Sequence, residues 1–348
     1  MKDRAPVRSA TLHDVAKAAG VSPITASRAL GRPDLVSEKT RARVQAAVQE
    51  TGYLPNLLAG GLKSRRSLMV AGIVPALSVT QFLPTVQSLT TTLAAEGYQV
   101  ILGQTAYDAE REEAVLNTMI SRRPDGIVVT GLVASDRARE RLRRSGIPVV
   151  ETWDFTDDPV DMLVGFSHDR VGRATGDYFR ARKWQRVGVA TGGDPRALMR
   201  RAGFVAALGR EVPTAVVPAP SSLELGRRAL AELLGRSPGI EAVCCSSDTL
   251  AHGVIVEALS RGMRVPQDLA VSGFGDAEAS AHLLPSITSV HVDGPGIGRL
   301  AAGLILARCR GEAVARPVVD LGFELIERQS TAAGAAPDAG PVRASAKD

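Results

Sequence analysis

Short hydroxyl side chains recur at the predicted starts of three helices in residues 11–53, and an arginine lies on the second of these helices. A hydroxyl at a helix start, together with the free backbone amides there, can hold a phosphate group. Arg28 can make the bidentate contact to guanine, which discriminates among bases by roughly 1–3 kcal/mol. These residue types predict DNA binding, although the same hydroxyls could serve only as caps on a solvated basic face. The candidate contacts are Thr11, Ser22, Thr25, Ser37 and Thr40 for phosphates, and Pro23, Ile24, Ser27 and Arg28 for bases.

The first of these helices has a start and a stop in the sequence. Thr11 followed by Asp14 is a capping box, because the hydroxyl and the carboxylate can each satisfy a free backbone amide. The box predicts a helix over 12–19, and Gly20 suits the left-handed position that ends it.

The second helix is predicted to run from Ser22, which caps it, to about Leu30. Pro23 stands at its first position, where a missing N–H costs nothing. Ser37 caps a third helix, which Gly52 ends. Two short helices around a glycine turn describe a helix-turn-helix, so we expect the second helix to enter the major groove.

The positive charge of the chain is concentrated at one end. The 348 residues carry a formal net charge of +5, but residues 1–66 hold 12 Lys and Arg against 5 Asp and Glu. The remaining residues hold 30 basic and 32 acidic side chains. This asymmetry indicates a nucleic-acid-binding module joined to a near-neutral body.

Composition excludes several other classes of protein. Hydrophobic residues make up 45% of the chain and charged residues 23%, which is ordinary for a globular protein. No apolar run reaches the ~18 residues of a membrane span, and the first residues lack the apolar stretch of a signal peptide. Three cysteines, of which Cys244 and Cys245 are adjacent, do not suggest a disulfide framework, and the five histidines are scattered. We therefore expect a cytoplasmic, nucleoid-associated protein without a membrane anchor, metal or cofactor.

The body of the chain, residues 67–331, alternates short β-branched runs with segments of helical length. The runs include SLMVAGIVP, YQVILGQTA, DGIVVTGLV, IPVVETW, RVGVATGG, EAVCCSSD, LAVSGFG and ITSVHVD. Continuous apolar runs separated by helices of about 10–15 residues predict parallel strands buried on both faces. The expected fold class is α/β, with room for two doubly wound lobes behind the helix-turn-helix domain.

Composition also predicts where the parts of the chain meet. Residues 1–10 are expected to form a mobile tail, and residues 11–54 the helix-turn-helix domain. Residues 55–66, PNLLAGGLKSRR, have the composition of a linker. Residues 332–348 are low in apolar bulk and are expected to be a disordered tail.

The segments TLHDVAKAAGVSPITASRAL and VSEKTRARVQAAVQETGYLPN closely resemble the N-terminal domain of LacI/GalR-family transcriptional regulators, and the match runs ungapped from Thr11 to Leu62. The resemblance implies that the segment after Tyr-x-Pro-Asn becomes a hinge helix only on operator DNA, where a leucine from each protomer enters the minor groove. An apolar wedge of this kind unstacks a base step and kinks the duplex. The hinge positions that the resemblance assigns to DNA binding are Tyr53, Asn56, Ala59 and Leu62.

Two features depart from the family pattern. Gly60 and Gly61 stand where better helix formers are usual, each weaker by about 1 kcal/mol than alanine, so we expect hinge folding to depend strongly on DNA. Pro23 and Ile24 occupy the family's specificity positions but offer no side-chain hydrogen bonds. They would recognise a base only by apolar contact, for example with a thymine methyl group.

The body resembles a periplasmic-binding-protein-like core through VGFSHDRVGRATGDYF, MRRAGFVAAL, CSSDTLAHGVIVEALSRGMRVPQDLAVSGF and LPSITSVHVD. The resemblance implies two lobes joined by three crossovers, with a small ligand between them. Open parallel sheets place ligand groups at the carboxyl ends of their strands, and the run ends here are polar. The candidate effector-binding residues are Phe82, Glu151, Trp153, Asp154, Arg200, Ser247, Asp248 and Asp276.

Arg200 matches the effector-binding arginine of the family. A buried fork of N–H donors suits a carboxylate or vicinal hydroxyls. The alternative is a surface arginine beside Arg196 and Arg201. Asp248 has the alternative role of a helix cap, and Trp153 that of a core side chain.

Two further departures narrow the class of effector. Gly275 replaces a carboxylate that binds sugar hydroxyls in many family members, and Ser247 replaces a common asparagine. Loss of a negative charge while Arg200 is kept favours an anionic ligand over a neutral sugar. The stretches PVVE, VGF, GFG and DLGFEL look most like the gluconate-operon-repressor branch. The expected effector is therefore a sugar acid such as gluconate, or a sugar.

Other functions find less support in the sequence. Gly296, Gly298 and Ala301 fit a G-x-G-x-x-A dinucleotide fingerprint, but Pro295 lies inside the supposed phosphate loop. The chain has no Walker loop, nucleophile elbow or H-E-x-x-H motif. A stand-alone sugar-binding protein would fit the body but would have no use for residues 11–62.

The sequence therefore predicts a DNA-binding transcriptional regulator, a repressor rather than an enzyme. Palindromic operator DNA implies two-fold symmetry, so a homodimer or a larger assembly is expected. Effector binding is expected to move the two lobes and the hinge segments, so that effector and operator each change the other's affinity by linkage.

Overall fold

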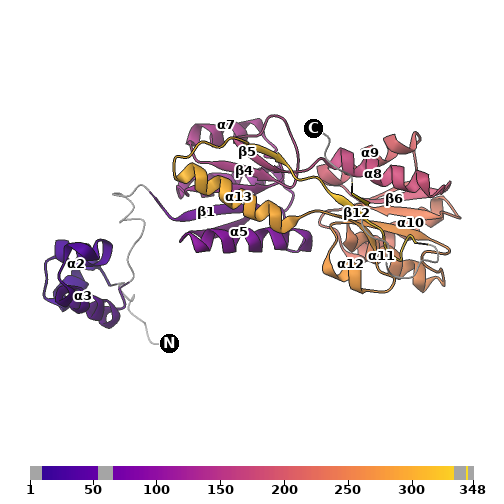
Figure 1. The fold of residues 1–348 in the computed structure, drawn as a ribbon. Helices are drawn as coiled ribbons and strands as arrows, with labels where there is room; N and C mark the ends of the chain where they lie inside the picture. Colours follow the sequence, from indigo (N-terminus) through magenta and orange to yellow (C-terminus); the bar gives the residue numbers. More distant parts are fainter. Residues whose placement is uncertain (1–9, 54–65, 333–341, 344–348) are drawn as a thin grey trace. The chain divides into compact units, whose positions relative to one another are not determined.

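The computed structural model describes residues 10–53, 66–332 and 342–343, and the chain divides into two compact units between Ser67 and Leu68. The first unit is helical, and the second is an α/β core with two sheets (Figure 1). Within the described residues, no helix has both the length and the apolar character that a membrane span requires.

The helices of the first unit begin and end where local sequence predicts. Asp14 Oδ2 accepts a hydrogen bond from the Thr11 N–H at 2.8 Å, which completes the capping box. Gly20 (φ 61°) and Gly52 (φ 63°) end the first and third helices in the left-handed conformation that favours glycine. The described elements are α1 (Leu12–Ala19), α2 (Pro23–Gly31), the 3-10 turn η1 (Pro33–Leu35) and α3 (Glu38–Thr51).

A small apolar core holds these helices together. Val15 on α1, Ala29 on α2 and Val44 on α3 are buried in it, and such short side chains let the helices approach closely. Arg43 on α3 donates hydrogen bonds to the carbonyl groups of Ala19 and Gly20, which joins α3 to the end of α1. The outer face of α2 contributes nothing to this core, so its side chains are exposed.

The first lobe of the core contains a parallel sheet of six described strands in the order β11-β5-β4-β3-β1-β2. Its inner strands are continuous apolar runs, as a sheet covered on both faces requires. One buried cluster joins the sheet to α5 and α13, and another joins it to α6 and α7. Figure 1 shows α5, α7 and α13 beside the sheet. The strands are β1 (Met69–Val74), β2 (Gln99–Gln104), β3 (Gly126–Thr130), β4 (Val149–Thr152), β5 (Met162–Gly165) and β11 (Val318–Asp320), and the helical segments are η2 (Thr80–Phe82), α5 (Leu83–Ala95), α6 (Ala109–Ser121), α7 (Asp136–Ser145) and α13 (Gly294–Cys309).

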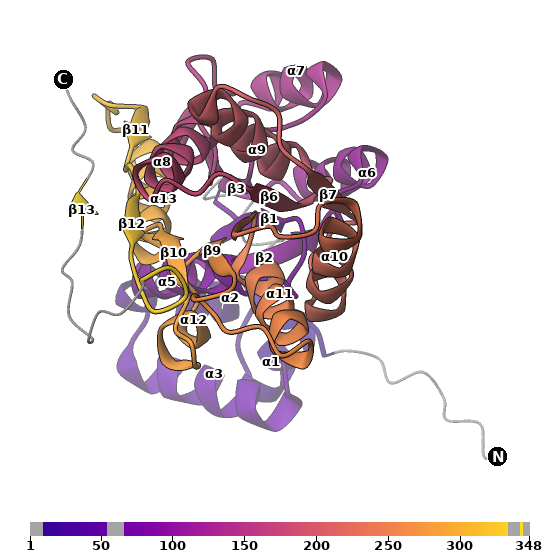
Figure 2. The same ribbon diagram turned by 90° about the vertical axis from the view of Figure 1, so that its right-hand side faces the viewer.

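The second lobe contains a sheet of seven described strands in the order β13-β12-β10-β9-β8-β6-β7, in which β12 and β13 are antiparallel to their neighbours. Helices α8 and α9 pack on one face, and α10 and α11 on the other (Figure 2). The strands are β6 (Val187–Gly192), β7 (Thr214–Val217), β8 (Ala242–Cys245), β9 (Ala270–Phe274), β10 (Thr288–His291), β12 (Glu324–Ile326) and β13 (Val342–Arg343), and the helices are α8 (His168–Ala181), α9 (Pro195–Leu208), α10 (Leu223–Arg236), α11 (Asp248–Ser260) and α12 (Glu278–His282).

The chain passes between the lobes three times, at residues 166–167, 292–293 and 321–323. Each lobe is doubly wound, so the predicted fold class is confirmed. All eight apolar runs named from the sequence are strands, and β13 lies in the segment that was expected to be a disordered tail. Strands β5, β7, β11 and β12 were not predicted either. These strands have three or four residues each, which is too short a stretch to carry a periodic signal.

The glycines of the G-x-G-x-x-A motif, Gly296 and Gly298, lie within α13, and Gly298 serves helix packing. A Cβ atom on Gly298 would lie 2.4 Å from the Thr85 carbonyl oxygen of α5. The missing side chain thus lets the backbones of α5 and α13 approach each other, and the segment around Gly298 is a helix–helix contact rather than a phosphate loop.

Candidate functional site

The exposed face of α2 carries the side chains predicted to read bases. Ile24 is 65% exposed although it is a large apolar residue, and Ser27 and Arg28 are also exposed. Pro23 occupies the first turn and is partly buried. These exposed apolar, hydroxyl and guanidinium groups are of the types that can contact base edges.

Three of the five predicted phosphate-binding hydroxyls, those of Thr11, Ser22 and Ser37, are helix caps, and those of Thr25 and Thr40 lie in the first turns of α2 and α3. Ser22 Oγ accepts a hydrogen bond from the Thr25 N–H at 3.2 Å, and Ser37 Oγ accepts one from the Thr40 N–H at 3.4 Å. Ser22 and Ser37 are therefore caps at exposed helix starts, and phosphate binding by these hydroxyls stays a prediction. Tyr53 is half-buried against the small core of this unit. The hinge positions Asn56, Ala59 and Leu62 lie outside the described residues.

A pocket lies between the two lobes of the core, at the carboxyl ends of strands from both sheets. Five of the eight predicted effector residues line it: Phe82, Trp153, Arg200, Ser247 and Asp248. The lining also contains Ser78, Val79, Thr80, Gln81, Tyr107, His168, Asp194, Arg196, Ala219, Ser221, Ser246, Thr249, Phe274, Gly275 and Ala277.

Arg200 is half-buried in this pocket rather than on the surface of α9. Its guanidinium carbon lies 4.0 Å from the centre of the Phe274 ring, and its Nη2 donates to the Ser246 carbonyl at 2.9 Å. Burial lowers the pKa of Arg200 to about 10, which leaves it positively charged at neutral pH. Its Nε is buried without a hydrogen-bond partner, so a donor remains for an anion.

His168 begins α8 and holds Arg200 in place. Its Nδ1 lies 2.9 Å from Arg200 Nη1, and its Nε2 lies 3.0 Å from the Trp153 carbonyl oxygen. Burial and the positive charges of Arg200 and Arg196 hold the pKa of His168 well below its usual value. The sequence interpretation had not selected His168, although it follows a strand and begins a helix.

Arg196, one helical turn before Arg200 on α9, lines the same pocket. Its guanidinium carbon lies 5.3 Å from the centre of the Phe82 ring, and its Nη1 is buried without a hydrogen-bond partner. From sequence, Arg196 had been counted as a sign of a surface helix. The i, i+4 spacing of two arginines could have indicated a shared face.

Tyr107 and Asp194 are further lining residues that the sequence interpretation missed. Tyr107 follows β2 and adopts a left-handed backbone conformation (φ 60°), and Asp194 caps α9 by accepting from the Ala197 N–H at 3.1 Å. Both follow carboxyl ends of strands, which is the signal that could have identified them.

Ser247 and Asp248 have different roles at the start of α11. Ser247 is the helix cap, since its Oγ accepts from the Leu250 N–H. Asp248 is 4% exposed and accepts three hydrogen bonds, which come from the Ala277 N–H, Ser280 Oγ and Ser289 Oγ at 2.6–2.8 Å. Asp248 therefore connects α11 to β10 and to the loop that borders the pocket.

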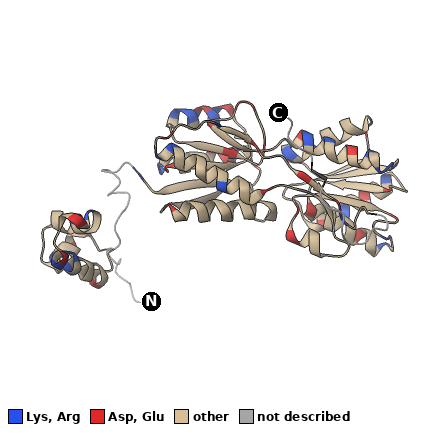
Figure 3. Cartoon of the chain, in the orientation of Figure 1, with Lys and Arg blue, Asp and Glu red and all other residues tan. Residues whose placement is uncertain are grey.

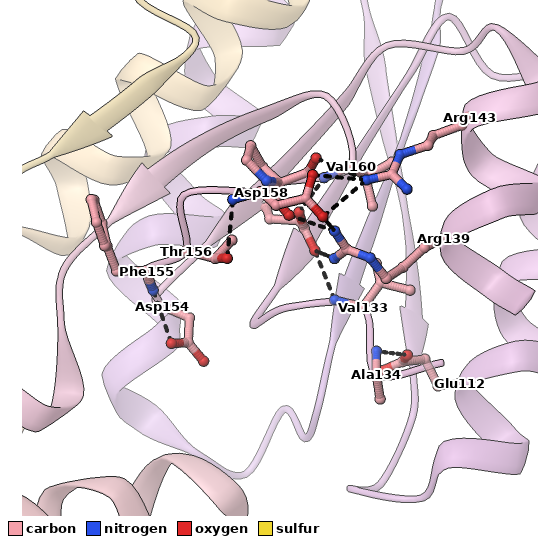
Figure 4. A network of polar contacts seen from close by, with 12 residues as sticks. Glu112, Val133, Ala134, Arg139, Arg143, Asp154, Phe155, Thr156, Asp158 and Val160 are labelled. Carbon is pink, nitrogen blue, oxygen red and sulfur yellow. Dashed lines mark hydrogen bonds and ion pairs between the residues drawn. The ribbon is translucent and has the colours of Figure 1, made fainter. Parts of the chain in front are cut away.

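Glu151 is placed outside the pocket, contrary to expectation. It is fully buried, and its carboxylate accepts from the Val133 and Val160 N–H groups at 2.8 and 2.7 Å. Arg139 Nη1 lies 3.6 Å from Glu151 Oε1, and the same guanidinium group pairs with Asp158 (Figure 4). The carboxylate faces this network, so it holds two loops of the first lobe rather than facing a ligand.

Asp154 and Asp276 are also absent from the lining of the pocket that contains Arg200. Asp154 borders an adjoining pocket that shares Tyr107, Asp194 and Arg196 with the first one, and it accepts a hydrogen bond from the Phe155 N–H (Figure 4).

Asp276 is bound to neighbouring side chains. It pairs with Arg328 at 2.6 Å and with His291 at 3.0 Å. Burial alone would raise the pKa of Asp276, but these two partners hold it below its usual value. The carboxylate is therefore engaged in the second lobe, next to lining residues Gly275 and Ala277.

In comparisons with known proteins, the helical unit and the α/β core match two different family models. The family model of bacterial regulatory proteins of the lacI family matches residues 11–56, and that of the periplasmic binding protein-like domain matches residues 176–331. The HTH-type transcriptional regulator GntR of Pseudomonas aeruginosa is 37% identical over 92% of this chain and 95% of its own length.

Solved structures agree as well. A LacI-family transcriptional regulator from Silicibacter pomeroyi is 35% identical, with a TM-score of 0.87 over 92% of this chain and 99% of that one. The lac repressor dimer bound to operator and an anti-inducer is 23% identical, with a TM-score of 0.79 over 94% and 100% of the two chains, and it shares the fold.

The helical unit and the two-lobed core together define a transcriptional regulator with a helix-turn-helix domain and a pocket suited to a small molecule. The similarity to the GntR regulator extends over nearly the whole chain and, with the lacI family model, identifies the family. The chain belongs to the LacI family of DNA-binding transcriptional regulators.

Proposed function

We propose that this regulator is a repressor whose operator affinity is controlled by an anionic sugar acid, such as gluconate, bound between the lobes of the core. The observation that carries the proposal is the pair of arginines on α9. Arg196 and Arg200 both line the pocket, and each has a buried N–H group without a hydrogen-bond partner. An unsatisfied buried donor is costly, and a ligand carboxylate would relieve that cost at both residues.

The other charged groups of the pocket support an anion as well. Asp248 already accepts three hydrogen bonds, and Asp194 Oδ1 accepts one at the start of α9. His168 is neutral, so it adds no charge. Among the charged side chains of the lining, the buried atoms without a hydrogen-bond partner are N–H donors of the two guanidinium groups, which favour a carboxylate over a neutral hydroxyl.

A sugar acid also carries hydroxyl groups, which need partners of both kinds. Gln81, Ser221 and Thr249 line the pocket and can donate or accept. Phe82 and Trp153 also belong to the lining and make part of the pocket wall apolar. The lining thus supports a small, polar ligand with one acidic end.

On the DNA side, we propose that α2 enters the major groove with Ile24, Ser27 and Arg28 toward the bases. The exposure of these side chains supports the proposal. The capped starts of α1, α2 and α3 would lie against phosphates. The regulator acts as a homodimer on a palindromic site in the cytoplasm, with no catalytic activity.

Effector control follows from linkage between the two sites. A ligand that prefers one arrangement of the lobes changes operator affinity by the ratio of its affinities for the two arrangements. The charged residues of the core are mixed in sign over both lobes (Figure 3), so the core adds no uniform basic surface of its own. We therefore assign operator contact to the helical unit and the linker.

Titration calorimetry of the full chain with D-gluconate and D-glucose tests this proposal. We expect heat of binding with gluconate, and binding about 10–100-fold weaker for Arg200→Ala and for Arg196→Ala. Arg201→Ala is the matched control, because Arg201 is also on α9 but pairs with Glu211 and does not line this pocket. Binding of glucose without binding of gluconate, or equal losses in all three variants, would overturn the proposal.

A further inference from the structure

A continuous series of hydrogen bonds leads from the pocket into the first lobe. Arg200 donates to His168, whose Nε2 contacts the Trp153 carbonyl. The Trp153 indole N–H donates to Thr85 Oγ1 at 2.9 Å, and the Thr85 hydroxyl donates to the Gly294 carbonyl at 2.8 Å. We name Arg200, His168, Trp153 and Thr85 the Arg200–Thr85 relay.

The relay connects the two lobes at their junction. Arg200 and His168 belong to α9 and α8 of the second lobe, whereas Thr85 is on α5 of the first. Trp153 follows β4, and Gly294 begins α13, directly after a crossover between the lobes. The relay therefore ends on both helices that cover one face of the first sheet.

Burial makes the relay rigid. Trp153 is 1% exposed, His168 3% and Thr85 4%, so water does not compete for their hydrogen bonds. The Trp153 ring packs edge-on against Phe82 and Phe166, with ring centres 5.1 and 5.8 Å apart. A change in the position of one member is therefore passed to the next.

The backbone of Trp153 supports a functional role for the relay. Its φ of 60° lies in the left-handed region, which is costly for a bulky side chain. Such a conformation persists only where surrounding contacts hold it, and residues of this kind cluster at ligand-binding and switch regions. The hydrogen bonds of the Trp153 carbonyl and indole are contacts of this kind.

We propose that the Arg200–Thr85 relay transmits occupancy of the pocket to α5 and α13, with His168 and Trp153 as positioning residues. This inference rests on the proposed function, since it names the route by which a ligand at Arg200 acts. A bound anion attracts the Arg200 guanidinium group and so changes its hydrogen bond to His168. The resulting displacement of His168 moves Trp153, which contacts the first lobe. That lobe contains β1, the first strand after the helical unit along the chain.

Thr85→Val tests the relay without touching the pocket. Valine keeps the shape of threonine but can neither accept from Trp153 nor donate to Gly294. We expect the gluconate dissociation constant to change less than about twofold. Operator affinity is measured with and without about 10 mM D-gluconate. The fold-change that gluconate causes should be at least about fivefold smaller in Thr85→Val than in the wild type. The operator is a palindromic duplex selected with the wild-type protein.

Two variants control for loss of structure. Thr85→Ser keeps the hydroxyl and should retain the wild-type ratio. Ser88→Ala removes a hydrogen bond of 2.8 Å from Ser88 to the Pro295 carbonyl, which joins the same two helices outside the relay. It should also retain the ratio. A wild-type ratio in Thr85→Val, or an equal loss in Ser88→Ala, would overturn the inference.

A second measurement tests the relay without a ligand. Arg200→Lys and Thr85→Val are combined in a double-mutant cycle read by the thermal unfolding midpoint. Substitutions within one hydrogen-bond network have non-additive effects on stability. We therefore expect the unfolding midpoint of the double variant to fall by at least about 2 °C less than the sum of the two single decreases. Arg200→Lys with Ser88→Ala should be additive.

The outcomes separate the inference from the proposed function. Absence of gluconate binding in the wild-type protein would overturn the proposed ligand, and the double-mutant cycle would then decide the relay by itself. Additivity of Arg200→Lys with Thr85→Val would overturn the relay even if gluconate binds.

Discussion

Arg200 Nη1 and His168 Nδ1 lie 2.9 Å apart, and this contact defines the protonation state of the histidine. Because the Trp153 carbonyl can only accept, His168 Nε2 carries the proton and Nδ1 is the acceptor for the guanidinium. A neutral imidazole is the only form that satisfies both contacts. The low pKa of His168, caused by burial and by Arg200 and Arg196, agrees with this geometry.

The first prediction concerns the pH dependence of ligand binding. Between pH 6 and 8.5, we expect the gluconate dissociation constant to change less than about twofold, because His168 stays neutral and Arg200 stays charged throughout. Affinity should decline as the pH approaches the Arg200 pKa of about 10, where the guanidinium begins to lose its charge. Calorimetry across this range measures the profile. A step in affinity near pH 6.5 would mean that the histidine titrates and that the assigned contact is wrong.

The second prediction concerns Asp248. Asp248→Ala leaves one backbone N–H and two hydroxyl groups without their acceptor, so the free energy of unfolding should fall by roughly 3 kcal/mol or more. Asp157→Ala is the control, since Asp157 is exposed in the loop between β4 and β5, and its unfolding midpoint should match that of the wild type. Urea unfolding followed by circular dichroism measures both. Wild-type stability with loss of gluconate binding would instead make Asp248 a direct ligand contact.

The third prediction compares two glycines on α13. Gly298→Ala would force a Cβ to within 2.4 Å of the Thr85 carbonyl oxygen, so we expect a loss of about 1–3 kcal/mol in unfolding free energy. A Cβ on Gly303 would meet no atom within 4 Å, so Gly303→Ala should stabilise the protein by about 0.5–1 kcal/mol through helix propensity. Thermal unfolding of the two variants checks the opposite signs. Equal effects would show that α5 and α13 do not approach closely in solution.

The fourth prediction concerns base recognition. Arg28→Ala should relax the preference at one position of each half-site by about tenfold, since a bidentate arginine–guanine contact is lost. Arg41 on α3 is a suitable control, as it carries the same charge and pairs with Glu38. Arg41→Ala should lower the affinity for all duplex sequences by the same factor and leave the selected consensus unchanged. Selection from a random duplex library measures both, and an unchanged consensus for Arg28→Ala would indicate a phosphate contact.

Local sequence determined much of this protein. Ser22 with Thr25 and Ser37 with Thr40 predict helix starts because a cap needs only residues three positions apart. The apolar runs predict buried parallel strands for a similar reason, since continuous hydrophobicity reports burial on both faces. The family resemblance followed from the order of such short segments. The helix-turn-helix, the α/β class and the division of the chain were therefore open to prediction.

Only the tertiary structure decided which polar groups meet. Glu151 was predicted to face a ligand, yet Val133 and Val160 supply backbone N–H groups that occupy its carboxylate. Arg196 had the pattern of a surface residue and lines the pocket instead. The contacts that decide these roles join residues distant in sequence, as Arg200 and His168 are, and depend on which way each side chain turns. The spacing of Arg196 and Arg200 indicates that they share a face of α9, but only the packing of the two lobes determines what that face contacts.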